Sequence, residues 1–138
     1  MAWNIPNMNI TQHSNLKSVN MTNEADVYDA LRYRVTVDQS GTRRYRDAKG
    51  RYHREGGPAI ELASGERGWF KNGKRHRVDG PALEEYDGSR HWYQNGERHR
   101  NDGPAIEWSD GSRQWFLYGR EYTEAKFLAR LEVLVFSK

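Results

Sequence analysis

The sequence predicts a mainly β protein (α+β): an antiparallel β-meander of 23-residue hairpin repeats, with a short N-terminal helix and a C-terminal capping helix. Three observations support this fold class. A shift of 23 positions superposes residues 72–92 on residues 95–115. The turn dipeptides Asn72-Gly73 and Asp87-Gly88 recur at that spacing. Apolar and polar residues alternate between these turns, which is the period of a strand, and a fixed repeat of this length indicates a repeat architecture.

The composition predicts one folded domain without cysteine chemistry. The chain has 138 residues, of which 36% are hydrophobic and 30% charged, and it contains five Trp, eight Tyr and four Phe. Such aromatic content is not typical of disorder. The absence of cysteine excludes disulfides and Cys-based zinc sites. We see no apolar run long enough to span a bilayer and no secretion signal in the first thirty residues, so we expect a cytoplasmic protein.

The N-terminal part divides into a tail, a helix and a hairpin. Residues 1–21 are polar and Asn-rich, and we expect a tail that is disordered or loosely held, followed by one domain over 22–138. Thr22 or Asn23 can cap a short helix that continues to Leu31, with acidic residues in its first turn. Apolar residues then alternate over 33–37, a turn follows at 38–42, and residues 43–46 form the returning strand.

The repeats cover about 43–65, 66–88 and 89–111, with a partial unit over 112–122. Asn-Gly and Asp-Gly dipeptides both suit two-residue hairpin turns. A two-residue turn at Asp87-Gly88 pairs Leu83 with Trp92, so that the aligned tryptophans share one face with the aliphatic residues. We expect that face to be buried and the opposite aromatic row to be half exposed. The two rows are Trp69, Trp92 and Trp115, and Phe70, Tyr93 and Phe116.

The chain ends in a predicted helix. Thr123 can cap a helix over about 124–136. Its apolar residues recur at three- and four-residue intervals, which predicts a buried stripe. The stripe consists of Phe127, Leu128, Leu131, Leu134 and Val135. The two helices either close the two ends of the array or both pack on one face of the sheet.

The repeat pattern resembles a known hairpin family. Trp69, Gly73, His76, Gly80 and Asp87-Gly88 follow the W-x-x-x-G-x-x-H pattern of the MORN repeat, and the next unit repeats it. The chain departs from that pattern because Arg follows each His, and in two of the three units this Arg leads into R-x-D-G-P-A. This variant resembles a group of small tailed-bacteriophage proteins mostly without an assigned activity, and the resemblance implies a phage protein that engages a host molecule.

Recurring polar residues are interpreted as structural. His53, His76 and His99 are equivalent, yet equivalent positions two strands apart are separated by about 10 Å, too far to share a metal ion. We therefore expect each ring nitrogen to bond a loop carbonyl, and we expect no metal and no cofactor. Asp before Gly-Pro suits a turn whose carboxylate a nearby Arg can bind. The pairs are Arg77 with Asp79 and Arg100 with Asp102.

The sequence contains no catalytic motif, so we expect a non-enzymatic protein-binding module that engages and inhibits or redirects a host protein, such as a defence component. The expected binding surface combines Phe70, Tyr93 and Phe116 with Arg77 and Arg100. One alternative is nucleic-acid binding by an Arg/Trp ladder of Arg67, Arg90 and Arg113 with the tryptophans two residues later. A second alternative is an anionic-membrane or structural scaffold protein. An open sheet edge would also allow identical chains to associate.

Overall fold

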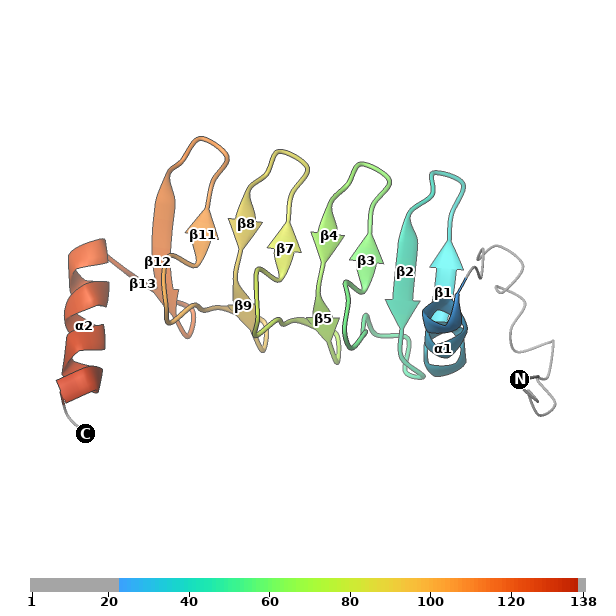
Figure 1. Cartoon of the computed structure of the whole chain (residues 1–138), viewed down its shortest axis with the longest axis horizontal. Coiled ribbons are helices and arrows are strands. Elements are labelled where there is room, and N and C mark those ends of the chain that lie inside the picture. The colour runs from blue at the N-terminus through green and yellow to red at the C-terminus, as the bar shows by residue number, and fades with distance from the viewer. Residues whose placement is uncertain (1–22, 137–138) are drawn as a thin grey trace.

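The computed structural model describes residues 23–136 and shows a long, open row of hairpins with one helix at each end (Figure 1). The elements are α1 (Glu24–Arg32), β1 (Arg34–Val37), β2 (Arg43–Arg46), β3 (Ile60–Glu61), β4 (Arg67–Gly68), β5 (Phe70–Lys71), β6 (Lys74–Arg75), β7 (Leu83–Glu84), β8 (Arg90–His91), β9 (Tyr93–Gln94), β10 (Glu97–Arg98), β11 (Ile106–Glu107), β12 (Arg113–Leu117), β13 (Arg120–Tyr122) and α2 (Glu124–Phe136). In the described chain, the main sheet has nine strands in the order β1-β2-β3-β4-β7-β8-β11-β12-β13. The predicted antiparallel meander is confirmed.

The N-terminal elements begin where the sequence predicts. Asn23 caps α1, because its side-chain oxygen accepts the backbone N–H of Asp26 at 3.0 Å. β1 and β2 then form an antiparallel hairpin in which Val35 lies opposite Tyr45. Both side chains are buried and form a core cluster with Tyr33 and the fully buried Ala59 of the first repeat. The predicted tail lies outside the described residues.

The Asn-Gly turns have the predicted geometry. Asn72 and Gly73 both have positive φ, 51° and 80°, and Lys71 pairs with Lys74 across them. This is the two-residue type I′ turn, for which Asn and Gly are favoured because they tolerate the left-handed region. The equivalent turn of the last unit uses Tyr118 (φ 49°) before its glycine.

The Asp-Gly turns are different, and the prediction of a two-residue turn was wrong there. The Glu85 N–H donates to the Ser89 carbonyl at 2.9 Å, so three residues form the loop. The Asp87 carboxylate accepts the Ser89 N–H at 2.8 Å, and only Gly88 is left-handed. This is the three-residue hairpin loop with one left-handed glycine. The pairing therefore shifts by one residue, and Leu83 lies opposite His91 instead of Trp92.

Successive side chains of a strand point to opposite faces of the sheet. A shift of one residue in the pairing therefore places the aliphatic residues on the face opposite to the tryptophans. Leu83 and Ile106 share their face with the Phe70, Tyr93 and Phe116 row, while the tryptophans share theirs with alanines. Phe116 is 7% exposed and Ile106 is 1% exposed. The expected half-exposed row is thus buried at Phe116, and the expected buried tryptophan row is half-buried throughout. The alanines at the repeat position Ala59, Ala82 and Ala105 have no exposed surface.

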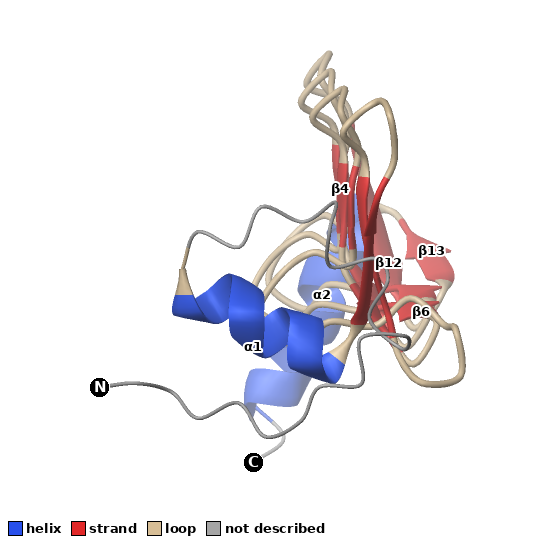
Figure 2. Ribbon diagram, turned by 90° about the vertical axis from the view of Figure 1, so that its right-hand side faces the viewer, coloured by secondary structure: helices blue, strands red, loops and turns tan. Residues whose placement is uncertain are grey.

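The helices lie at opposite ends of the array and also on the same side of the main sheet (Figure 2). α1 contacts β1, and α2 contacts β12 and β13. The predicted cap of α2 is present, since Thr123 Oγ1 accepts the Lys126 N–H at 3.3 Å. Its predicted buried stripe is only partly correct, because Phe127 is 1% exposed whereas Leu128 and Val135 are mostly exposed. No helix among residues 23–136 is long and apolar enough to cross a bilayer.

Candidate functional site

Each repeat turns a corner that is organised by one arginine. In the second unit, Arg77 Nε donates to Asp79 at 3.0 Å, and one terminal nitrogen donates to the Pro81 carbonyl at 3.1 Å and to Glu84 at 3.5 Å. The guanidinium also stacks 4.0 Å from the ring centre of Trp69. Arg100 makes the same contacts one unit later, including a stack on Trp92 at 4.0 Å. Both predicted Arg–Asp pairs are therefore brought together.

The corner sequence follows from the space that this guanidinium needs. A Cβ atom at Gly80 would lie 2.9 Å from Arg77 Cζ, so any larger residue would collide with the guanidinium. Ala82 follows at a position with no exposed surface, which leaves room for one methyl group. The R-x-D-G-P-A sequence is thus explained by one planar cation packed between a ring, a carboxylate and the chain.

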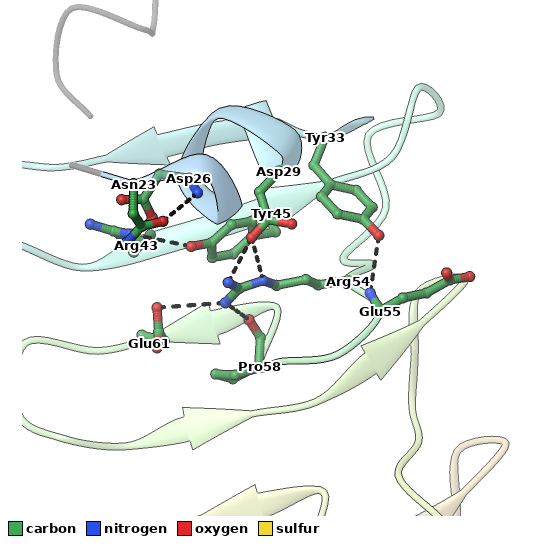
Figure 3. Close-up of polar contacts among 10 residues, drawn as sticks. All are labelled: Asn23, Asp26, Asp29, Tyr33, Arg43, Tyr45, Arg54, Glu55, Pro58 and Glu61. Atoms are coloured by element: carbon green, nitrogen blue, oxygen red, sulfur yellow. Dashed lines mark hydrogen bonds and ion pairs between the residues drawn. The ribbon is translucent and has the colours of Figure 1, made fainter. Parts of the chain in front are cut away.

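The first corner is completed by α1. Position 56 is Gly, where the second unit has Asp79, so the corner keeps only the more distant carboxylate of Glu61, 4.0 Å from a terminal nitrogen of Arg54, and lacks the nearer one. Asp29 of α1 supplies it: Arg54 Nε and a terminal nitrogen donate to one Asp29 oxygen at 3.1 and 2.7 Å (Figure 3). Arg54 also donates to the Pro58 carbonyl and stacks 3.9 Å from the centre of the Tyr45 ring. α1 therefore substitutes for a missing part of the repeat.

The three histidines hold adjacent units together. Nδ1 of His53, His76 and His99 accepts a backbone N–H at 2.9 to 3.0 Å, from Asn72, Asn95 and Tyr118 respectively. The prediction of a bonded loop carbonyl was wrong, because the left-handed turn residue of the next unit presents its N–H instead. Within the described residues, no group of three His, Asp or Glu side chains is placed to hold a metal ion.

The burial of His99 makes the stability of the array depend on pH. Burial lowers the pKa of the His99 imidazole, against a weaker opposing effect of the Glu97 carboxylate. Because the folded-state pKa lies below the unfolded value of about 6.5, the unfolded chain binds more protons. The contribution of the neutral His99 imidazole to the free energy of unfolding is therefore complete above about pH 6.5, and it is lost as pH falls through the folded-state pKa.

We expect the urea unfolding midpoint to fall between about pH 7.5 and about pH 5, and to fall less in His99→Gln. The Gln amide oxygen can accept the Tyr118 N–H at any pH, whereas protonated Nδ1 cannot. Equal losses in the two proteins would show that His99 does not contribute to the acid sensitivity.

A row of alternating rings and arginines runs along the small hairpins. The Arg75 guanidinium lies 5.6 Å from the Phe70 ring centre and 5.7 Å from that of Tyr93. Arg98 lies in the same way between Tyr93 and Phe116, at 6.0 and 5.4 Å. Neither arginine was predicted as a site residue, although their 23-residue spacing could have identified them. Phe70, Tyr93 and Phe116 therefore contact arginines of their own chain.

One position in this row lacks a hydrogen bond that its repeat has. Arg98 Nε donates to the Tyr93 hydroxyl at 3.2 Å, whereas Arg75 Nε is buried without a partner because Phe70 has no hydroxyl. We expect Phe70→Tyr to raise the free energy of unfolding by about 1 kcal/mol. Urea denaturation measures this change. Phe116→Tyr is the control, since among residues 23–136 no such orphaned nitrogen is found beside that ring, and an equal gain there would contradict the explanation.

A cavity of about 310 Å³ lies between the first and second corners. Its lining includes Gly56, which stands where the other corners have Asp and has open space beside it. Phe70 and Arg77, both predicted as partner-binding residues, line it, whereas Tyr93 and Arg100 belong to the next unit. Its lining also includes Trp69, Lys71 and the carboxylate of Asp79, which is 86% exposed. In the described chain, Lys71 takes part in no ion pair, so its ammonium is available to a ligand.

The arginines of the nucleic-acid hypothesis alternate with glutamates. One row crosses seven neighbouring strands of the main sheet in the order Arg43, Glu61, Arg67, Glu84, Arg90, Glu107, Arg113. Arg67 and Glu84 form an ion pair at 2.6 Å. The row is therefore a ladder of opposite charges, and its charge is not uniformly positive.

Comparisons of the chain with protein-family models, with curated proteins and with solved structures find no match.

Proposed function

We propose that this chain is a non-catalytic protein-binding module whose cavity between the first two corners receives a side chain of a partner protein. The observation that carries the proposal is that cavity, with aromatic walls and an unpaired ammonium at Lys71. At about 310 Å³ it suits a single anchoring side chain, and such anchors dominate the energetics of protein interfaces.

The lining defines the kind of anchor. Trp69 and Phe70 offer apolar surface to the body of a side chain, while Lys71 and Asp79 offer one charge of each sign. The arginines of the two corners already bind carboxylates of their own chain, so they shape the walls. The best-fitting anchor has an apolar body and a polar tip, as Tyr has.

We further propose that the partner is a host protein, met in the cytoplasm of the host cell. This part of the proposal is supported only by the resemblance of the R-H-R-x-D-G-P-A corners to bacteriophage proteins. Affinity purification from expressing bacterial cells, read by mass spectrometry, would identify the partner.

The same purification tests the surface. Lys71→Glu reverses the charge at the cavity, and we expect it to abolish capture of the partner. Lys74→Glu is the matched control, because Lys74 lies opposite Lys71 in the same hairpin and does not line the cavity. Loss of binding in both variants, or in neither, would remove the cavity from the binding surface.

Nucleic-acid binding is a second candidate, favoured by one observation. Arg90 and Arg113 are exposed, and no ion pair is found for either within residues 23–136. If they bind phosphates, affinity for single-stranded DNA falls steeply with salt. A gel-shift titration at low salt without a complex would exclude this function.

A further inference from the structure

The repeat array ends at a strand whose next neighbour is missing. In the inner units, the strand that descends from each hairpin pairs with the first strand of the next unit, as β4 does with β7 and β8 with β11. β12 is the equivalent last strand (Figure 1). In the described pairings its residues Arg113 and Gln114 have β11 on one side and no strand on the other. β13 covers only residues 115–117 of that edge.

The charge ladder stops at the same place. At the other end of the row, a terminal nitrogen of Arg43 lies 3.7 Å from a carboxylate oxygen of Asp26 in α1. Every inner arginine has a glutamate on each neighbouring strand. Arg113 has Glu107 on one side only, is exposed, and forms no ion pair with the described residues. The nearest carboxylate of β13, that of Glu121, accepts the Gln114 side chain at 3.1 Å, and none of the described carboxylates on the vacant side pairs with Arg113.

The hairpin tips show what else is missing. Ser89, 1% exposed, accepts the backbone N–H of Ser109 from the next unit at 3.0 Å. The Ser109 hydroxyl in turn donates to Asp87 at 3.2 Å. Ser112 and Asp110 occupy the same repeat positions in the last hairpin, but both are exposed. Two acceptors are therefore available beside Arg113.

We propose that this edge binds an extended segment of a partner protein, which adds a tenth strand beside β12 and reads aliphatic-acidic-any-Ser. The pattern is that of the segments that fill the inner positions. Their first two residues are Ile60-Glu61, Leu83-Glu84 and Ile106-Glu107, and the last continues to Ser109. The acidic residue faces Arg113, the backbone N–H two residues later donates to Ser112, and the serine hydroxyl donates to Asp110. Addition of a strand to an open edge is an established mode of peptide recognition.

A second copy of the chain fits this edge less well. Two β12 edges paired about a two-fold axis would bring Arg113 close to its own equivalent, and like charges opposite one another are unfavourable. The outer edge of β1 offers Val37 in the charge row, so it supplies no carboxylate. A partner segment with an acidic residue satisfies Arg113, and neither edge of a second copy does.

The test uses the full chain and a fluorescein-labelled peptide, PAIEWS, which copies residues 104–109. We expect saturable binding by fluorescence anisotropy and about fivefold to tenfold weaker binding of PAIKWS, because an exposed charge pair is worth up to about 1 kcal/mol and a like pair is repulsive. Arg113→Glu should reverse this preference in favour of PAIKWS. Lys126→Glu, an equal change of charge on α2, should leave it unaltered.

The result that overturns the proposal is equal binding of the two peptides, or a preference that Arg113→Glu does not reverse. A dimer that Arg113→Glu dissociates in sedimentation would also overturn it, since the occupant would then be a second copy. The cavity proposed above is tested separately. Lys71→Glu should not change peptide binding, so each site can fail without the other.

Discussion

Asp29→Ala is expected to lower the free energy of unfolding by about 3 kcal/mol, measured by urea denaturation. The Asp29 and Arg54 side chains are only 13% and 17% exposed, and their ion pair joins α1 to the first corner. Removing one member of a buried pair leaves the other charge desolvated and costs about 3–5 kcal/mol. The lower figure applies because both groups keep some contact with water, and because Arg54 retains its bond to the Pro58 carbonyl.

Glu24→Ala is the matched control for Asp29→Ala. Glu24 is an exposed acidic residue in the first turn of the same helix, and no salt bridge of the described chain includes it. Its removal should cost less than about 1 kcal/mol, through the helix dipole alone. Similar losses in the two variants would mean that Asp29 contributes to the helix and not to the corner.

Phe127→Ala is expected to lower the free energy of unfolding by about 3–5 kcal/mol, the usual range for truncating a buried Phe. Phe127 is 1% exposed and is the most deeply buried described side chain of α2, so its loss should release α2 from β12 and β13. In a repeat array the stability of each unit depends on its neighbours, so an end can separate before the centre unfolds. Hydrogen exchange resolved by residue should therefore show lost protection in α2 first.

Leu128→Ala tests the same helix one residue later. Leu128 is 51% exposed, so little apolar surface is returned to water and the loss should stay below about 1 kcal/mol. If Leu128→Ala were as damaging as Phe127→Ala, α2 would pack on the array through a different face.

The two ends of the array are closed by different means. α1 supplies carboxylates, Asp29 to Arg54 and Asp26 to Arg43, and so continues the polar pattern of the repeat. α2 supplies the ring of Phe127 and leaves Arg113 without an ion pair among the described residues. This asymmetry is the reason why the C-terminal edge is the one proposed to take a further strand.

The sequence alone predicted the features that depend on local chemistry. The 23-residue period sets the number of hairpins, and Asn72-Gly73 sets a type I′ turn because both central residues must have positive φ. Helix caps were predicted at Thr22 or Asn23 and at Thr123, because a side-chain oxygen there can meet a free backbone N–H within three residues, and Asn23 and Thr123 make these bonds. The residues of the corner could be chosen in the same way, since Arg77 and Asp79 are two positions apart.

Only the structure decided the length of the Asp-Gly loops, which sets the partners on each face, and what completes the ends. The Asp87 carboxylate binds the Ser89 N–H, and the loop has three residues. The added residue shifts the pairing by one position, so that Leu83 lies opposite His91 and not opposite Trp92. Asp29 and Arg54 meet across 25 positions because α1 folds back onto the first corner, and no local pattern relates them. Local hydrogen bonds select the turns, but the pairing of distant segments depends on packing between units, which the sequence pattern leaves open.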